Sequence, residues 1–399
     1  MALASTAFMA APGLYGTNLD KIDCSDVLAA ILLSDTSILG AIPFKGQVQN
    51  IEHFWIEDSL NAVSFTASSA SSTTLTISAP SASSNVQRIL RTYAIVYPGT
   101  GEFRMQFGAN PVTGGNTSMT TYGSTTWVAT TSTTWYVAAM PKADISAASS
   151  DISLARTRRR NFTQVFERAI EITQTRKGVA VYAVPDELKH QIQMRTYEIK
   201  REMNMSVIAG YAIASSSNTY SPDSEIRTMC GLIQLIRDPA LTSTNSDNST
   251  TQVSGALTES VINALAEKVF NRGGLDSKSD AVLVVPPYQQ RVISAFEKDR
   301  VRRDPDERKS GYYITKFITD LGYDLPIVVD RWMPTDKAIL LDKSRVALMP
   351  LKGDNWHTEK MAVTGRSEKW QISGQFTLEL RNPDEAHGLL YDLSTSGVV

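Results

Sequence analysis

The chain has 399 residues, of which 42% are hydrophobic and 20% charged, and its formal net charge is −2. This length allows two or three core-forming units, and the composition is that of an ordinary globular protein. A charge so close to zero gives no general attraction to nucleic acid or to an anionic membrane, so any DNA contact would come from local patches. The two cysteines, Cys24 and Cys230, cannot build a disulfide framework, and we expect both to be reduced and structural.

Residues 1–46 are the first predicted element, an N-terminal arm rich in small residues with a short helix expected at Ser25–Leu33. Neither Lys nor Arg precedes Lys21, so the arm lacks the basic start of a secretory leader. The chain contains no apolar run of the roughly 20 residues that cross a bilayer. The arm is either a disordered tail or a strap that becomes ordered only on a neighbouring molecule.

A strand is predicted within Gln47–Leu60, because Ile, Phe and Trp partly alternate there with polar residues. Its expected partner is Asn161–Thr173, which has a similar length and character. The two would be the strands of a long hairpin, at 47–60 and 152–176, around a long insertion.

The insertion, residues 61–151, is crowded with Ser, Thr, Ala and Gly, and it carries few charges. Turn residues separate short β-prone runs, so we predict a small all-β barrel or sandwich. A low-complexity linker is the alternative, but a solvated linker has little use for aromatic residues. The predicted runs are Thr73–Ile77, Arg91–Val96, Phe103–Phe107, Thr125–Ala129 and Trp135–Ala139.

A long helix is predicted from Pro185 to about Tyr211, within the segment 177–213, because strong helix formers fill it and Asp186 suits the N-cap. It is either an ordinary core helix or a rigid rod that carries two unlike β-rich regions, and the rest of the chain favours the rod. Its apolar residues recur with a 3.6-residue period: Leu188, Ile192, Ile199, Met203 and Val207 or Ile208.

Residues 214–346 alternate helix and strand signals, which is typical of an α/β subdomain. The predicted elements are a buried apolar segment at Ile226–Ile236, a loop at Ala240–Ser254, a helix from Thr258 to Phe270, a strand at Ala281–Val285 and a helix at Tyr288–Glu297.

A charge-dense loop, Lys298–Ser310, follows, in which Arg300, Arg302, Arg303 and Glu307 stand among charges that nearly cancel. It is either a solvated loop paired with itself or a contact between subunits at a crowded axis. From Tyr312 onward strands dominate, and we assign the last of them to the segment 347–399.

No pattern that carries catalytic chemistry is present. The four histidines are far apart in sequence, and no HExxH, GxSxG, Walker A or strand-linked GxGxxG motif occurs. We therefore predict no enzyme activity, no cofactor and no metal site, and we expect a structural or interaction protein.

One basic cluster, Arg156, Arg158, Arg159 and Arg160, precedes the return strand. Arginine suits bidentate contacts with carboxylates, so we favour pairing with acids of a neighbouring subunit. A solvated patch and a nucleic-acid patch are the alternatives.

The order of arm, hairpin insertion, long helix, α/β subdomain and returning strands resembles the α+β Hong Kong 97-type fold of tailed-phage major capsid proteins. The phrases HFWIEDSL, RTRRRNFTQVFERAIEITQT, ELKHQIQMRTYEIKREMN and TDLGYDLPIVVDRWMPTDKAILLD are similar to the SU-ten-like branch of that family. The resemblance implies an E-loop that includes the hairpin and the 61–151 module, a peripheral (P) domain built on the helix at 177–213 and the strands of 347–399, and an axial (A) domain at 214–346.

The resemblance further implies a virion protein whose copies form the hexamers and pentamers of an icosahedral shell around double-stranded DNA. The expected partners are other copies of the chain, a separate scaffolding protein, the portal, possible decoration proteins and the packaged DNA without sequence readout, with assembly in the bacterial cytoplasm and no membrane. The alternative is another β-rich virion protein, such as a tail-tube, decoration or adhesin subunit.

Two departures from the family prototype lead to expectations of their own. No Lys occurs between Lys45 and Lys142, so the distal insertion lacks the nucleophile that cross-links the prototype, and we expect a shell held without covalent bonds. The arm is also too short to contain a scaffolding region, so we expect a separate scaffolding protein.

Overall fold

The structure is a computed structural model of the chain, and its residues form two compact units. One unit is Ile56–Arg158, and the other comprises Met1–Trp55 and Arg159–Val399. The predicted helix at Ser25–Leu33, the predicted strand at Thr125–Ala129 and the loop at Lys298–Ser310 lie outside the described residues. The described residues are 37–58, 60–70, 74–79, 89–99, 104–108, 116–122, 133–142, 144, 153–179, 186–212, 227–238, 250–276, 280–296, 316–362 and 365–396.

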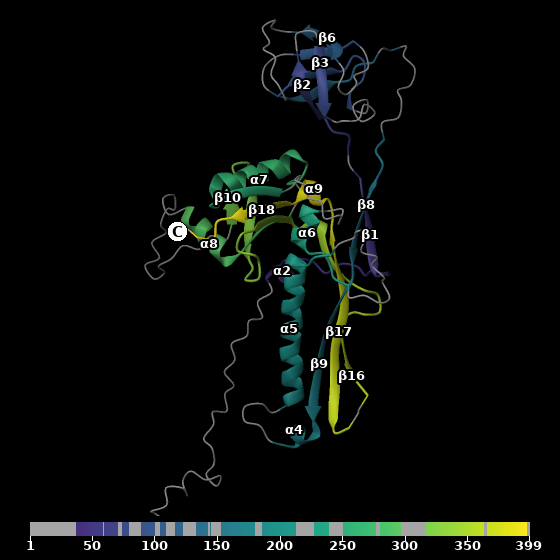
Figure 1. The fold of residues 1–399 in the computed structure, drawn as a ribbon, viewed down its shortest axis with the longest axis vertical. Helices are drawn as coiled ribbons and strands as arrows, with labels where there is room; N and C mark the ends of the chain where they lie inside the picture. Colours follow the sequence, from purple (N-terminus) through teal and green to yellow (C-terminus); the bar gives the residue numbers. More distant parts are fainter. Residues whose placement is uncertain are drawn as a thin grey trace, which may run out of the picture. The chain divides into compact units, whose positions relative to one another are not determined.

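Helix α5 (Glu187–Ala209) forms the long rod of the larger unit, as the sequence predicts (Figure 1). The side chain of Asp186 caps it by accepting the backbone N–H of Lys189 at 3.2 Å. Its predicted apolar stripe faces the core: the side chains of Ile199, Met203, Val207 and Ile208 are buried, and Leu188 and Ile192 pack against the same cluster. The helix ends at Gly210, where a Cβ would lie 2.4 Å from the backbone oxygens of Ser206 and Met229.

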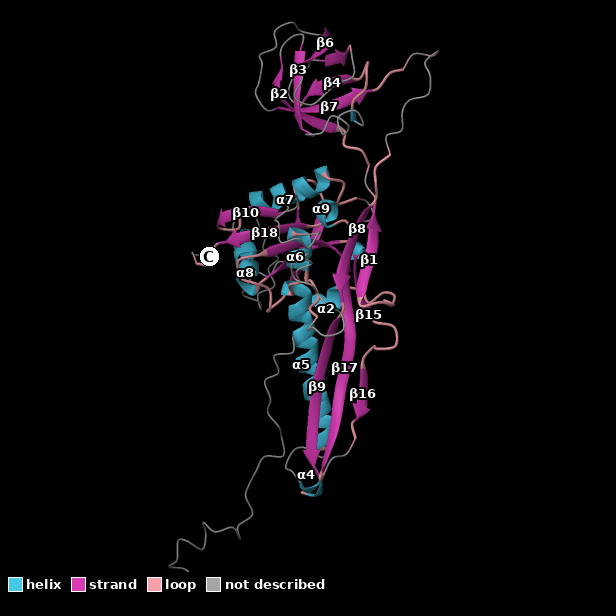
Figure 2. Ribbon diagram, turned by 45° about the vertical axis from the view of Figure 1, so that its right-hand side comes forward, coloured by secondary structure: helices cyan, strands magenta, loops and turns pink. Residues whose placement is uncertain are grey.

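A four-stranded antiparallel sheet lies along α5 (Figure 2). Its long strand β17 (Ser367–Leu380) pairs with β9 (Gln164–Thr173), β15 (Val346–Pro350) and β16 (His357–Lys360). Alternate residues of β9, among them Phe166 and Ile170, are buried, which explains why one face of this sheet needs the cover of the helix.

The pairing of the hairpin agrees with the prediction only in part. Strand β1 (Glu52–Glu57) forms a two-stranded sheet with β8 (Thr157–Phe162), whereas most of the predicted partner is β9, which pairs with β17 at ten positions. The expected partner thus belongs to two different ladders separated at Thr163. Sequence character identifies a strand, but it does not identify the strand beside it.

A six-stranded mixed sheet forms the α/β part of the larger unit, in the order β10-β18-β14-β11-β13-β12. Helix α7 (Glu259–Asn271) begins after the cap Thr258, and helix α8 (Pro287–Phe296) joins the parallel pair β11 and β13. The strands are β10 (Thr250–Gly255), β11 (Ala281–Val285), β12 (Lys316–Ile318), β13 (Asp324–Val329), β14 (Ala338–Asp342) and β18 (Gly388–Leu393).

Two features of this sheet correct the sequence-based assignment. The predicted loop Ala240–Ser254 overlaps strand β10, which pairs in parallel with β18. Strand β18 lies within the segment 347–399, which was assigned to the sheet beside the long helix, yet it pairs with β14 in the α/β part. Its Leu389 and Leu390 are fully buried there, so burial of the last apolar run returns the chain to this sheet.

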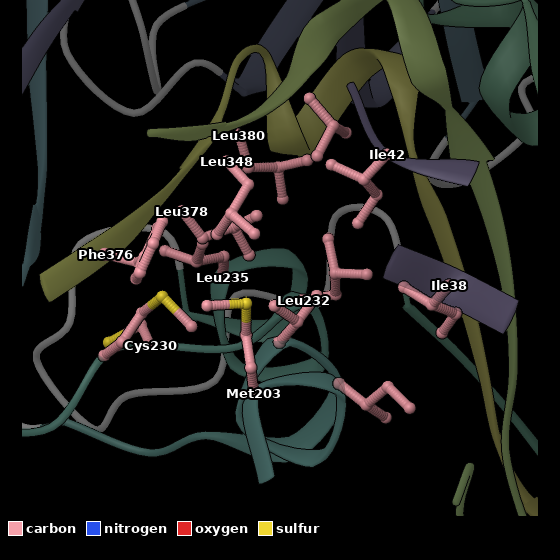
Figure 3. Close-up of a cluster of buried hydrophobic side chains, with 14 of the residues drawn as sticks. Ile38, Ile42, Met203, Cys230, Leu232, Leu235, Leu348, Phe376, Leu378 and Leu380 are labelled. Carbon is pink, nitrogen blue, oxygen red and sulfur yellow. The ribbon is translucent and has the colours of Figure 1, made fainter. Parts of the chain in front are cut away.

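A continuous apolar cluster joins the long helix, the four-stranded sheet and the short helix α6 (Leu232–Arg237) (Figure 3). The N-terminal helix α2 (Ser37–Ala41) adds Ile38 to it. The predicted buried segment Ile226–Ile236 supplies Met229, Cys230, Leu232, Leu235 and Ile236 from its described part. Burial raises the pKa of the Cys230 thiol to about 12, so this cysteine behaves as a small core residue.

The smaller unit contains a closed barrel of antiparallel strands in the order β2-β3-β6-β5-β4-β7, with Trp135 and Phe107 completely buried inside it. Strands β2 and β6 do not coincide with any predicted run, because their Ser- and Thr-rich sequences show little apolar alternation. The strands are β2 (Ser64–Ala70), β3 (Thr74–Ala79), β4 (Ile95–Pro98), β5 (Arg104–Phe107), β6 (Asn116–Tyr122) and β7 (Thr133–Ala139).

Candidate assembly interface

The arginine cluster lies on strand β8 and the residue before it, and Arg156, Arg159 and Arg160 form ion pairs within the chain. Arg156 lies 3.3 Å from Asp58, and both side chains are largely exposed, so this pair contributes little to stability. Arg160 lies 2.8 Å from Glu52 on the neighbouring strand β1. Arg158 is exposed on the same strand.

Arg159 ties the base of the hairpin to the rest of the larger unit. Its guanidinium lies 3.0 Å from the Asp384 carboxylate on helix α9 (Pro383–Ala386), and both side chains are mostly buried. Loss of one partner would leave the other charge partly desolvated, which costs more than the loss of a surface pair. Arg159 therefore orients strand β8 from within its own subunit.

His53 makes a second tie from strand β1. Its Nε2 lies 2.6 Å from Oε2 of Glu379 on β17, whose side chain is only 3% exposed. Burial alone would raise the pKa of the Glu379 carboxyl, but hydrogen bonds from His53 and Arg381 outweigh it and lower the pKa. The Glu379 carboxylate thus remains charged inside the protein and anchors β1.

A buried amide, Asn161, fixes the point where β8 turns toward β9. Its Nδ2 donates to the carbonyl oxygens of Cys230 at 3.2 Å and Leu378 at 2.7 Å. Its Oδ1 accepts from the backbone N–H groups of Cys230 at 2.9 Å and Phe162 at 2.8 Å. One side chain therefore satisfies backbone groups from three segments.

A further polar cluster surrounds His387, where the chain passes from strand β17 of the four-stranded sheet to strand β18 of the six-stranded sheet. The imidazole of His387, which is fully buried, accepts the backbone N–H of Asp342 through Nδ1 and approaches the carbonyl oxygen of Arg381 through Nε2, both at 3.2 Å. These contacts assign the proton to Nε2. Burial lowers the pKa of His387 to about 4, so the ring is neutral at pH 7.

Strand β1 and the residues after it also carry exposed apolar side chains. Phe54 and Ile56, two positions apart on one side of the strand, are 38% and 67% exposed, whereas Trp55 between them is buried. Leu60 and Val63, which follow the strand, are 95% and 69% exposed. A run of large exposed apolar side chains on a two-stranded ladder is typical of a surface that another molecule covers.

The four-stranded sheet presents an outer face on the side opposite α5. Alternate residues of β9 are exposed there, namely Val165, Glu167, Ala169 and Glu171. Strand β16 lies on the other side of β17 and adds Glu359, whose side chain is 69% exposed. This face combines Val165 and Ala169 with three carboxylates, of which Glu171 lies 3.5 Å from Lys369 on β17 and Glu359 lies 3.9 Å from His357.

Neither chemistry nor metal binding is evident among the described residues. No group of three or more His, Cys, Asp or Glu side chains is placed to hold a metal ion there, and no helix in that part is long and apolar enough to cross a membrane. A cavity of about 330 Å³ between α5 and β16 is lined by Ile199, Trp356 and Ile372 together with Lys200 and His357.

The structure places the cluster on strand β8 and the residue before it, where Arg156, Arg159 and Arg160 form ion pairs within the chain and Arg158 is exposed. The other candidates, Arg300, Arg302, Arg303 and Glu307, lie outside the described residues. Sequence reasoning missed His53, Asn161, Glu379 and His387, because the groups they contact are mostly remote in the sequence and no local motif marks them.

Comparisons with known proteins agree on the architecture. The model of the family described as SU10 major capsid protein matches residues 11–394. A major capsid protein of Escherichia phage Phieco32 is 26% identical over 271 residues, which cover 58% of this chain and 75% of that protein.

Two capsid structures are similar in fold. The capsid asymmetric unit of cyanophage A-1(L) has a TM-score of 0.58 at 10% identity, over 96% of this chain and 99% of that one. A subunit from the capsid of an empty GTA particle has a TM-score of 0.52 at 11% identity, over 98% and 100% of the two chains. These similarities confirm the Hong Kong 97-type capsid fold.

Proposed function

The chain belongs to the SU10 major capsid protein family and is the major capsid protein of a tailed phage, and we propose that its copies assemble into the hexamers and pentamers of an icosahedral shell. The family is a structural one, so we propose a shell subunit without catalytic activity. The observation that carries the assembly proposal is the exposure of Ile56, Leu60 and Val63 on and after strand β1.

A two-stranded ladder is marginally stable in water, and one that exposes Phe54 and Ile56 is less favourable still. We propose that a second copy of the chain covers this face. Covering two such side chains would contribute on the order of 2–4 kcal/mol per contact, and the contact is repeated at every subunit of a ring.

The outer face of the β9–β17–β16 sheet is the surface of the second copy that best fits the hairpin. It offers Val165 and Ala169 to the apolar side chains, and its Glu167 and Glu359 complement the exposed arginines of the hairpin. The two surfaces are different, so the contact is head-to-tail, and head-to-tail contacts that close produce rings.

The arginine cluster would then have two roles. Arg159 and Arg160 form ion pairs with Asp384 and Glu52 and fix the base of the hairpin. Arg156, whose ion pair with Asp58 is largely exposed, and the exposed Arg158 contact the neighbouring copy. We keep the loop residues Arg300, Arg302, Arg303 and Glu307 as proposed contacts at the ring axis.

The test is a pair of substitutions at Ile56. Ile56→Asp places a charge in the contact and should leave a folded subunit that forms neither capsomers nor shells, whereas Ile56→Val keeps an apolar β-branched side chain and should assemble normally. Both are co-expressed with the phage scaffolding protein, and particles are analysed by sedimentation velocity and negative-stain microscopy. Normal shells from Ile56→Asp would remove β1 from the interface.

The remaining partners follow from the same proposal. A separate scaffolding protein, the portal and possible decoration proteins would bind the shell, and packaged double-stranded DNA would be contacted without sequence readout. A tail-tube, decoration or adhesin subunit remains the competing proposal; tubes or isolated oligomers in the same micrographs, in place of closed shells, would favour it.

A further inference from the structure

Residues 37–48, which precede strand β1, form a strap that is attached to the larger unit at two places. The first attachment is apolar: helix α2 places Ile38 in the main apolar cluster, and Ile42 follows it into the same cluster (Figure 3). Their side chains are 0% and 3% exposed. The strap therefore completes the core around the end of helix α5.

The second attachment is backbone pairing beside strand β15, to which the strap runs parallel. The N–H group of Leu348 donates to the carbonyl oxygen of Pro43 at 3.1 Å. Farther along, the N–H group of Lys352 donates to the carbonyl oxygen of Val48 at 2.7 Å, and the N–H group of Val48 donates to Pro350 at 2.9 Å. The strap thus covers the edge of β15 that does not pair with β17.

Two buried side chains, Asp330 and Asn204, hold the helical end of the strap. Oδ2 of Asp330 accepts the N–H of Ile38 at 3.2 Å, and Oδ1 of Asn204 accepts the N–H of Leu39 at 3.3 Å. Nδ2 of Asn204 also donates to Oδ2 of Asp330 at 2.9 Å, so the two side chains act as one latch. Asp330 is 1% exposed and forms no ion pair with a basic side chain in the described part of the chain.

This latch makes docking of the strap only moderately favourable. A carboxylate that is buried without a basic partner loses its hydration, and only its hydrogen bonds offset that loss. Release of the strap would return water to Asp330 and to the first N–H groups of α2, but it would also expose Ile38 and Ile42. Because these effects oppose each other, release should require less free energy than unfolding of the whole subunit.

A short link joins the strap to strand β1. Four peptide units connect Val48 to Glu52, the first residue of β1, and they can span only about 14 Å. Strand β1 pairs only with β8 in the described part of the chain, and a two-stranded ladder is marginally stable by itself. The position of the strap therefore restricts the movement of β1.

We propose that residues 37–48 are a releasable strap, latched by Asp330 and Asn204, whose release loosens strand β1. In the docked state the strap holds the chain against β15 just before the hairpin begins. In the released state β1 keeps only its own ties to the larger unit, such as the pair of His53 and Glu379. The inference concerns the folded subunit and does not depend on the shell function.

Hydrogen–deuterium exchange of the full-length, unassembled subunit at pH 7 tests the proposal. Mass spectrometry separates the strap, strand β1 and the ladder between β9 and β17. The amides of the strap, and those of Leu348 and Lys352 that donate to it, should exchange together and at least tenfold faster than the amides of the ladder. Equal rates in the strap and the ladder would overturn the proposal.

Substitution of Ile38 tests the coupling between the strap and β1. Ile38→Ala removes buried carbon atoms from the strap and should accelerate exchange in the strap and in β1 at least tenfold. Ile38→Val should accelerate the same amides about two- to tenfold, and it serves as the test if the alanine variant fails to fold. Faster exchange in the strap without faster exchange in β1 would refute the coupling.

Ile170→Ala is the matched control, because Ile170 on β9 is 4% exposed and belongs to the same apolar cluster. It should accelerate exchange in the ladder at least tenfold but leave the strap and β1 within about threefold of the wild type, since release of the strap does not open β9. An equal acceleration of the strap in this control would show that the strap opens only with the whole subunit.

Asn204→Ala tests the latch itself. It leaves the N–H of Leu39 and one oxygen of Asp330 with one hydrogen bond fewer in the docked state. Exchange in the strap and in β1 should therefore be at least fivefold faster than in the wild type. Wild-type rates in this variant would refute the role of the latch.

Discussion

The buried imidazole of His387 should make the subunit sensitive to acid, and the size of the effect can be worked out. Burial lowers the pKa of His387 from 6.5 to about 4. In the unfolded chain the ring takes up a proton below about pH 6.5, whereas in the folded chain it does so only near pH 4. The stabilising contribution is therefore present above pH 6.5 and is lost as the pH falls toward 4.

A difference of one pKa unit between the unfolded and the folded chain corresponds to about 1.4 kcal/mol. The difference between the two pKa values of His387 therefore corresponds to about 3 kcal/mol in the free energy of unfolding. Most of it, about 2.5 kcal/mol, should be lost between pH 7 and pH 4.5. Asp342, Arg345 and Arg381 lie around the ring, and other groups such as Glu379 also respond to acid. The prediction therefore concerns the difference between the wild type and a variant.

Urea unfolding of the unassembled subunit at pH 7.0, 5.5 and 4.5 measures this difference. The variant His387→Asn keeps an oxygen that can accept the Asp342 N–H but cannot be protonated in this range. It should be less stable than the wild type at pH 7 and should lose about 2.5 kcal/mol less on acidification. The control His190→Gln, on helix α5 outside this cluster, should show the wild-type change of unfolding free energy with pH. If His387→Asn shows the same change of unfolding free energy with pH as the wild type, the reasoning is wrong.

The remaining predictions concern the shell and the hairpin base. Because no Lys lies between Lys45 and Lys142, purified particles boiled in detergent should run as a single monomer band, and a ladder of multimers would contradict this. The chain expressed without a scaffolding protein should give aberrant or no particles, so correctly sized closed shells from the chain alone would show that the prediction is wrong. Asn161→Ala should lower the free energy of unfolding by about 3 kcal/mol, measured in urea, because it leaves buried backbone groups unpaired; a loss below about 1 kcal/mol would show that water replaces the amide. Arg158→Glu should block assembly of a folded subunit, and adding Glu167→Arg should restore it if the two charges meet across the interface, as electron microscopy of the particles can decide.

The arginine cluster shows how far sequence reasoning about the site extends. Four arginines at short spacing predict one basic cluster, since their proximity is local, but the prediction placed the cluster before a strand, whereas most of it lies on strand β8. Their partners cannot be predicted in this way: Asp384 lies 225 residues from Arg159, and Glu52 lies 108 residues from Arg160. Only the folded chain shows that two of these charges brace the hairpin from within.

The same limit applies to the strands. Apolar and polar residues alternate at 164–173, which predicts a strand. This alternation does not identify the strand that pairs with it. In the structure β9 pairs with β17, near the other end of the chain. The barrel strands β2 and β6 were missed because hydroxyl-bearing side chains give little apolar contrast between the two faces.

The sequence by itself determined the long helix, its cap at Asp186, its buried stripe and the strand Ala281–Val285. These features depend on neighbours a few residues away, so the helical period and the apolar run suffice to define them. The tertiary structure alone decided which strands pair, where β18 belongs and why His387 is neutral, because these features arise from packing between segments far apart in the chain. Burial and ladder pairing are properties of the whole fold, and no local window of residues contains them.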